Sequence, residues 1–200
     1  MTTATFAEPA VGTSNTTLAE PMEADDAPYE VVYGQRVEMP PMSIRAVMIT
    51  TRISSAINAF AKPKELGEAF TELLVHLPLP EDEGRDRRPD VSYFCYRRSS
   101  ESPAHDPDAN AWDVIPDLAI EVTSPSDRAE VQRKKVLEYF RAGVRSVWVV
   151  YPNLAIVDVY ETPTIVRVYG RNDSLADDPV LPGFLLRLAD LFAPFAPSGA

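Results

Sequence analysis

The sequence has little cysteine and little histidine, and this excludes several kinds of site. Cys95 is the single cysteine among 200 residues, so no disulfide can form within the chain. Single-cysteine chains are typical of a reducing compartment. The two histidines, His76 and His105, lie far apart in the sequence. A zinc site uses several Cys or His ligands, so we expect neither zinc binding nor histidine-based catalysis.

Targeting and membrane-spanning segments are also missing from the sequence. The first residues contain no basic segment followed by an apolar run, which a secretory signal requires. No apolar run approaches the length of a membrane span. We therefore expect a cytoplasmic protein that makes no membrane contact.

Positive charge is scarce, with 19 Lys and Arg against 30 Asp and Glu and a net charge of −11. Residues 1–27 carry five of the acids, contain no Lys or Arg and show no apolar periodicity, which predicts a disordered acidic tail. We expect one domain over 28–195 and a flexible C-terminus over 196–200. Binding of nucleic acid would need a local basic patch. The best candidate cluster is Arg85, Arg87, Arg88, Arg97 and Arg98.

The rest of the chain alternates strand and helix patterns. A β-hairpin is expected over 29–39, and Ser43 can cap a helix of about 18 residues that stops at Pro63. Other expected strands span 70–77, 89–95, 117–123, 144–150, 155–160 and 165–169, with a helix over 127–142 before Gly143, a polar connection over 97–114, and a short strand with a helical turn over 183–192. This order predicts an α/β (α+β) fold with a central mixed sheet flanked by helices.

The strand over 117–123 is the most informative stretch. Its apolar residues alternate with a second set that contains Asp117 and Glu121, so two carboxylates lie on the face opposite the predicted core. A solvated face would explain them, because antiparallel sheets often keep one face in water. A metal or polar site beside the sheet would explain them as well.

The following helix offers a lysine to these acids. Asp127 and Glu130 have the spacing of a capping pair at its start. Lys134 lies on a charged outer stripe together with Glu138, whereas Lys135 leans toward the protein. Lys135 either lays its stem over apolar surface with its ammonium in water or reaches the carboxylates of the preceding strand.

The strand direction decides which acids can meet. If the strands that begin at Asp90 and Asp117 are antiparallel neighbours, Asp90 approaches Glu121, and Asp117 lies about 13 Å from Glu121 at ~3.3 Å per residue. If they are parallel, the two Pro-Asp pairs line up and Glu121 is displaced. The antiparallel case makes Asp90 and Glu121 a pair for Mg²⁺ or Mn²⁺, since hard cations prefer carboxylate oxygens. Such an ion can polarise a phosphodiester and activate water while a lysine assists.

Several motifs follow one another over residues 28–195. They are Tyr29-Glu30 with Gly34, Pro89-Asp90-Val91, Pro116-Asp117-Leu118-Ala119-Ile120-Glu121-Val122-Thr123-Ser124-Pro125-Ser126, Lys135-Val136-Leu137-Glu138-Tyr139 and Gly143-Val144-Arg145-Ser146-Val147-Trp148-Val149-Val150. In this order the motifs resemble the Uma-two family, widespread bacterial proteins described as restriction-endonuclease-like and of the PD-(D/E)XK fold. The resemblance implies a restriction-endonuclease-like core and a Mg²⁺-dependent site.

The resemblance also implies the roles of individual residues. Asp90, Glu121 and Lys135 would be the two acids and the lysine of the catalytic site, and Asp90 and Glu121 would hold the metal. The lysine would have moved from the strand to the following helix, because the strand position two after Glu121 is Thr123. Glu30, in the hairpin, is a secondary candidate. Asp117 is another, although its place at the strand entrance favours a structural role.

We therefore expect a Mg²⁺-dependent endonuclease that hydrolyses phosphodiester bonds of nucleic acid, with DNA as the expected substrate. The alternative is a catalytically inactive binding or regulatory module on the same scaffold. The acidic balance favours this alternative, as do two departures from the family pattern: residues 43–46 contain no His, and Tyr151 stands where Asp often precedes Pro152. The sequence is silent on the oligomeric state, and a homodimer is compatible with it.

Overall fold

A six-stranded mixed sheet forms the centre of the computed structural model, which describes residues 27–99, 108–125 and 127–195. The strand order is β10-β9-β8-β7-β6-β3. Within this sheet β7 and β8 pair in parallel and the other neighbours are antiparallel. The predicted mixed sheet is therefore confirmed. Its strands are β3 (Gly67–Thr71), β6 (Val91–Cys95), β7 (Leu118–Val122), β8 (Ser146–Tyr151), β9 (Ile156–Tyr160) and β10 (Val166–Gly170).

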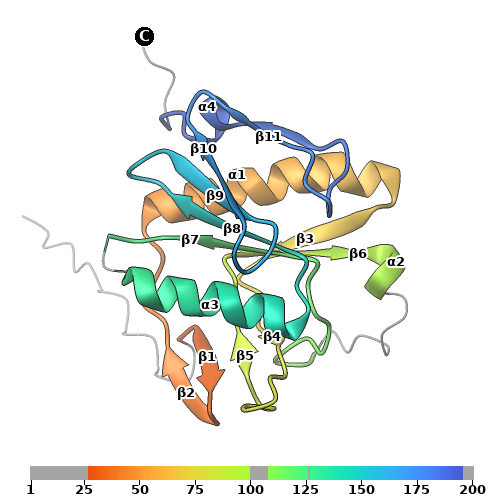
Figure 1. The fold of residues 1–200 in the computed structure, drawn as a ribbon, viewed down its shortest axis with the longest axis vertical. Coiled ribbons are helices and arrows are strands. Elements are labelled where there is room, and N and C mark those ends of the chain that lie inside the picture. Colours follow the sequence, from red (N-terminus) through yellow and green to blue (C-terminus); the bar gives the residue numbers. More distant parts are fainter. Residues whose placement is uncertain (1–26, 100–107, 126, 196–200) are drawn as a thin grey trace, which may run out of the picture.

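A smaller four-stranded sheet lies beside the first, at the lower end of the molecule in Figure 1. It contains the predicted N-terminal hairpin, whose two-residue turn has positive φ at Tyr33 (51°) and Gly34 (70°), the pattern of a type I′ turn. The strand order is β2-β1-β5-β4. Its strands are β1 (Tyr29–Val32), β2 (Gln35–Glu38), β4 (Val75–His76) and β5 (Asp86–Arg87), and a separate pair is formed by β11 (Ser174–Ala176) and β12 (Leu185–Arg187).

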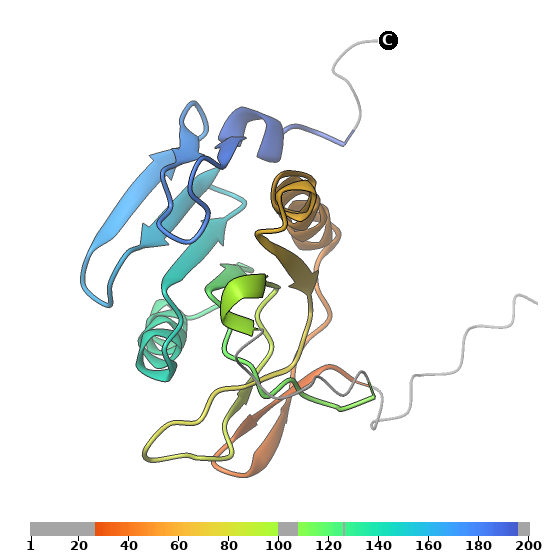
Figure 2. The ribbon, with the colours of Figure 1, turned by 90° about the vertical axis from the view of Figure 1, so that its right-hand side faces the viewer.

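Two long helices cover the two faces of the large sheet, as Figure 2 shows. Helix α1 (Ile44–Ala61) begins where the sequence predicts, because the Ser43 hydroxyl accepts a hydrogen bond from the Ala46 N–H at 3.2 Å. Helix α3 (Ala129–Ala142) ends at Gly143, which has φ 102° and provides the predicted left-handed stop. The short helices are η1 (Lys62–Lys64), α2 (Tyr96–Ser99) and α4 (Leu188–Leu191).

Strand β7 is buried on both faces. Leu118 and Ile120 belong to the apolar core on the α1 side, and Ala119 belongs to the core on the α3 side. Because β7 and β8 are parallel, the connection between them must cross over the sheet, and α3 makes this crossover. The helix removes the second face of β7 from water, so of the two explanations left open for its acids the solvated face is wrong.

Three further expectations need correction. The predicted strand over 70–77 is two strands, β3 and β4, separated at Glu72, which has φ 55°. Asp127 does not cap α3; its carboxylate accepts hydrogen bonds from the N–H and hydroxyl of Ser124 and closes the turn before the helix. Helix α2 occupies part of the predicted polar connection. The predicted tail, apart from Ala27, and the flexible C-terminus over 196–200 lie outside the described residues.

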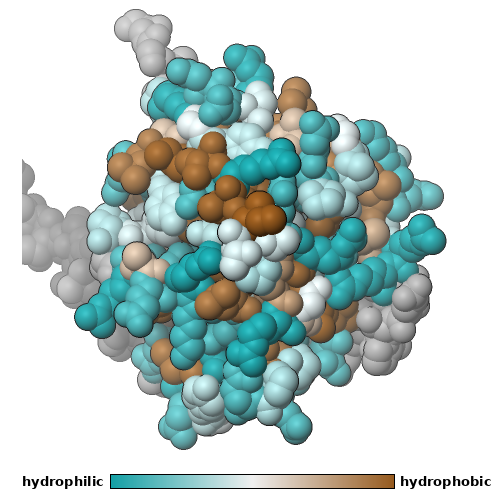
Figure 3. All heavy atoms as spheres, viewed as in Figure 1, coloured by the Kyte–Doolittle hydropathy of each residue, from teal (hydrophilic) through white to brown (hydrophobic). Residues whose placement is uncertain are grey.

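Strand β10 forms an exposed edge of the large sheet. Val166 and Val168 have exposed fractions of 41% and 62%. Figure 3 shows a hydrophobic patch over the β9–β10 region of an otherwise mainly hydrophilic face. This edge is at the opposite side of the sheet from β6 and β3. Among the described residues, no helix combines the length and apolar character that crossing a bilayer demands.

Gly67 in β3 lies so close to β6 that a single added methyl group should change stability. A Cβ added at Gly67 would lie 2.2 Å from the Phe94 carbonyl oxygen. We expect Gly67→Ala to lower the free energy of unfolding by about 1–3 kcal/mol, because backbone must move to admit the methyl group. Gly84→Ala is the matched control, since a Cβ there meets nothing within 4 Å. Urea denaturation of both variants checks this, and equal effects would contradict it.

Candidate active site

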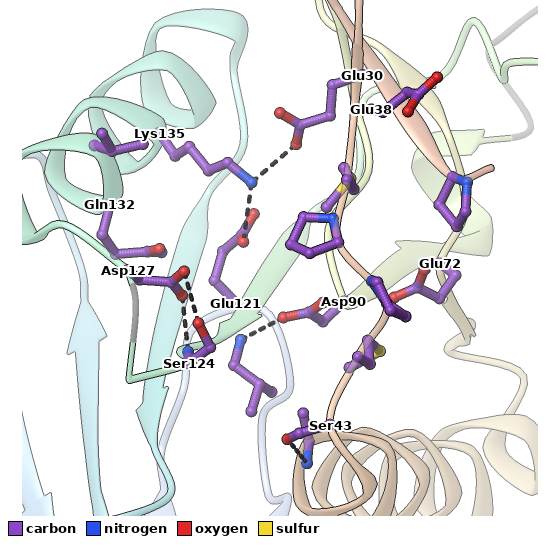
Figure 4. A pocket seen from close by; sticks show the side chains of 18 of the residues that line it. Glu30, Glu38, Ser43, Glu72, Asp90, Glu121, Ser124, Asp127, Gln132 and Lys135 are labelled. Carbon is purple, nitrogen blue, oxygen red and sulfur yellow. Dashed lines mark hydrogen bonds and ion pairs between the residues drawn. The ribbon is translucent and has the colours of Figure 1, made fainter. Parts of the chain in front are cut away.

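A cavity of about 360 Å³ lies at the carboxyl end of β7, between α3, the start of α1 and the N-terminal hairpin. Figure 4 shows side chains from these separate elements pointing toward it. Acids dominate the described lining, which has only Arg128 and Lys135 as basic residues. The acidic lining residues are Glu30, Glu38, Glu72, Asp90, Glu121 and Asp127.

Asp90 and Glu121 are brought together by antiparallel pairing of β6 and β7. The register pairs Val91 with Ile120, so the residue before β6 lies beside the penultimate residue of β7. Asp90 accepts a hydrogen bond from the Val122 N–H, which holds its carboxylate against the end of the strand. Of the two strand directions that the sequence left open, the antiparallel one is present and the parallel one is wrong.

The carboxylates at this end of the sheet repel one another. Burial, together with the negative charges of Glu121 and Glu72, raises the pKa of Asp90 to about 8. Burial also raises the pKa of Glu121, and the charge of Glu30 adds to it, although Lys135 acts in the opposite direction. The pKa of Glu72 is raised by burial too. These acids therefore lie in a place where a cation would stabilise their ionised forms.

Lys135 reaches the acids from α3. Its ammonium lies 2.9 Å from Glu30 Oε1 and 3.3 Å from Glu121 Oε2, and its side chain is 13% exposed. Of the two interpretations of Lys135, contact with the preceding strand is confirmed. Burial alone would lower the pKa of Lys135, but Glu121 and Glu30 together raise it above its ordinary value. Lys135 therefore carries a fixed positive charge in the cavity.

Glu30 and Tyr139 complete the contacts of Lys135 and Glu121. Burial alone would raise the pKa of Glu30, but Lys135 and Arg87 outweigh it and the pKa lies below its ordinary value. The buried Tyr139 hydroxyl donates a hydrogen bond to Glu121 Oε1. The Tyr139 ring lies in the core on the α3 side, and the expectations from the sequence did not single out its hydroxyl. Its position four residues after Lys135, on the same helical stripe, is the signal that could have found it.

A second layer of buried charge supports the hairpin. Arg87 donates to both Glu30 and Glu138, and Arg85 contacts Glu138 at 3.1 Å and Asp82 at 2.7 Å. Arg85 is 1% exposed and Glu138 is 3% exposed. The expectations that these arginines form a surface patch and that Glu138 lies on an outer stripe are wrong. Both expectations are wrong for the same reason: Arg85 and Arg87, in or next to β5 of the small sheet, pair with Glu138 and bury this side of α3.

Asp117 lies outside the cavity. It occupies the entrance of β7, at the other end of the strand from Glu121. Its carboxylate accepts a hydrogen bond from the Cys95 N–H at 2.8 Å and pairs with Arg98 at 3.2 Å. The sequence favoured a structural role for Asp117. In the structure its carboxylate contacts none of the other candidate site residues.

The donor set fits a hard divalent cation that keeps several waters. Among the described residues, no three His, Cys, Asp or Glu side chains converge into a ready-made cage. Mg²⁺ does not need one, because one or two carboxylates usually hold it in proteins. Asp90 and Glu121 supply two, and Glu72 Oε1, at the same cavity, is a buried oxygen without a hydrogen-bond partner among the described residues.

The mixed sheet, its β7-α3-β8 crossover and the acids at the end of β7 define a restriction-endonuclease-like domain. The Uma2 family model, described as "Putative restriction endonuclease", matches residues 17–189, and the chain belongs to this family. A solved structure described as a "putative nuclease belonging to DUF820" from Anabaena variabilis is 24% identical in sequence, with a TM-score of 0.69. The likeness covers 82% of this chain and 89% of that one and shows a shared fold. No curated protein matches the chain.

The buried charge layer predicts a large effect of a small substitution. We expect Glu138→Gln to lower the free energy of unfolding by about 3–5 kcal/mol, because it leaves two buried arginines without their shared carboxylate. Glu81→Gln is the matched control, since Glu81 pairs with Arg141 at the exposed surface and its loss should change stability little. Urea denaturation measures both. A Glu138→Gln variant as stable as the control would contradict the prediction.

Proposed function

We propose that this protein is a Mg²⁺-dependent endonuclease that hydrolyses phosphodiester bonds of nucleic acid, with DNA as the substrate. One observation carries the proposal: Asp90 and Glu121, from paired strands, face the same cavity as the ammonium of Lys135. Two acids and a lysine at the end of a mixed sheet supply metal binding and charge stabilisation together. Membership of the Uma2 family supports this choice of reaction.

The charge of the cavity supports a requirement for metal. Six acids and two bases line it among the described residues. A phosphodiester carries a negative charge, and like charges a few ångströms apart in a partly buried site repel each other strongly. A divalent cation bound to the acids would remove this repulsion and allow the phosphate to enter.

Each residue of the site has a distinct part in the proposed reaction. Asp90 and Glu121 would hold the ion, which, when bound, polarises the phosphodiester and makes a water molecule more acidic. Lys135 stabilises the negative charge that develops on the phosphate oxygens. Glu30 keeps the Lys135 ammonium in place at 2.9 Å, and Tyr139 orients Glu121 through its hydroxyl.

A non-catalytic binding or regulatory module is the second candidate, and one observation favours it. Both oxygens of Glu121 already have partners, because Tyr139 donates to Oε1 and Lys135 lies 3.3 Å from Oε2. In such a module Glu121 would keep these two partners permanently. The two candidates differ in metal affinity and in cleavage, which two experiments measure.

Metal titration tests the site without knowledge of the substrate. We expect calorimetry with Mn²⁺ to give a binding isotherm for the parent, and affinity at least about tenfold weaker for Asp90→Asn and Glu121→Gln, because each loses a carboxylate ligand. Glu81→Gln should bind like the parent, and circular dichroism checks the folding of each variant. If the parent binds no Mn²⁺ with or without a non-hydrolysable oligonucleotide, the metal site is wrong.

Substitution of Lys135 separates catalysis from metal binding. We expect Lys135→Met to cleave plasmid DNA in Mg²⁺ about 10²-fold or more slowly, since a charge that stabilises the transition state is lost. Mn²⁺ affinity should stay the same or rise, because a competing cation has left the carboxylates. Lys134→Met, at the exposed neighbouring position of α3, should cleave like the parent. A parent that binds Mn²⁺ but cleaves neither DNA nor RNA would favour the non-catalytic module.

A further inference from the structure

A second hollow, of about 740 Å³, lies next to the acidic cavity. The first turn of α1 separates the two: Ser43 and Ala46 line the acidic cavity, and Ile44 and Arg45 line the second hollow. The turn between β8 and β9 and residues 191–195 form its other walls. In Figure 1 these elements meet at the end of the sheet where β7 leads into α3. We call this hollow the α1 groove, because residues of α1 form one of its walls.

The α1 groove is basic, unlike the cavity beside it. Among the described residues, its lining contains three arginines, Arg45, Arg52 and Arg171, and no Asp or Glu. Positive charge of this kind is unusual in a chain with a net charge of −11. The charge of the α1 groove is therefore opposite in sign to that of the acidic cavity.

The contacts of these arginines leave their charges uncompensated. Arg45 donates to the Asn153 side-chain oxygen at 2.6 Å, and Arg52 donates to main-chain carbonyl oxygens of residues 191 and 193. Arg171 is exposed and makes no ion pair with another described residue. All of these acceptors are neutral. Two exposed arginines elsewhere do contact carboxylates: Arg141 pairs with Glu81 and Arg167 with Glu161.

We infer that the α1 groove binds the phosphate backbone of the nucleic-acid strand as it leaves the acidic cavity. This inference rests on the proposed function. The acidic lining of the cavity repels phosphates that are not held by the metal, so the flanking phosphates need positive charge nearby. Guanidinium groups bind phosphate oxygens with several donors, and Arg45 uses one nitrogen in its contact with Asn153. Phe195, 87% exposed in the same lining, offers a ring on which a base can stack.

DNA binding without cleavage tests the groove separately from the reaction. Fluorescence anisotropy with labelled duplex and single-stranded DNA in EDTA, at 50–200 mM salt, measures the dissociation constant and its salt dependence. The protein is the full chain with Glu121→Gln, which prevents turnover. We expect Arg45→Ala/Arg171→Ala in this background to weaken binding at least about tenfold at low salt, and to reduce the slope of log affinity against log salt by about 2. Arg52 is left intact because it holds residues 191 and 193.

Lys62→Ala/Arg141→Ala is the matched control. It also removes two exposed positive charges, from residues that lie outside the α1 groove. The salt slope of this control should equal that of the parent. If the control changes the slope as much as the groove variant does, the effect is one of net charge and the inference is wrong.

The remaining outcomes distinguish the groove from the reaction. If the parent binds DNA and the groove variant keeps its slope, the groove inference is overturned and the nuclease proposal is untouched. Groove-dependent binding by a protein that never cleaves in Mg²⁺ supports the groove and defeats the nuclease proposal. Absence of DNA binding by the parent overturns the inference. A groove variant that changes the mass measured by light scattering, with DNA affinity unaltered, would assign the groove to a second copy of this chain and overturn it as well.

Discussion

The ion pair of Lys135 with Glu30 and Glu121 is the interaction on which the site depends. It joins three elements that are distant in the sequence: the N-terminal hairpin, the central strand β7 and helix α3. Charges removed from water cost several kcal/mol each unless their partners are complete. The hairpin therefore has to dock before Lys135 has both of its carboxylate partners. The cavity is complete only when the small sheet is in place, because Glu30 and Glu38 of the hairpin line it.

Charge is separated over a short distance on this protein. The cavity collects acids, where burial together with the charge of neighbouring carboxylates raises the pKa of Asp90 to about 8. The adjoining groove has only arginines as charged residues among the described lining. Perturbed carboxylates of this kind are typical of functional sites. Under the proposed function, this separation is what would let a strongly acidic chain bind a polyanion. Local charge at the point of contact decides binding, because salt screens the interaction of charges that are more than about 10 Å apart at ~0.1 M ionic strength.

Much of the framework could be predicted from the sequence because local rules control it. Alternation within 117–123 identified β7 and placed Glu121 on the face opposite the α1-side core. Ser43 and Gly143 marked the start of α1 and the end of α3, since capping depends on a few neighbouring residues. Helical periodicity separated Lys135 from Lys134. Asp90 could be paired with Glu121 only by assuming a strand direction, which the sequence left open.

The sequence by itself determined the periodic elements and the candidate acids and lysine. Tertiary structure decided which charges are buried. Arg85, Arg87 and Glu138 have sequence neighbours typical of a solvated surface, yet they are buried because the small sheet packs against α3. The role of the Tyr139 hydroxyl likewise depends on where β7 lies beneath α3. Periodicity reports the direction of a side chain relative to its own element, whereas desolvation depends on what another segment brings to that face, and no local pattern encodes that.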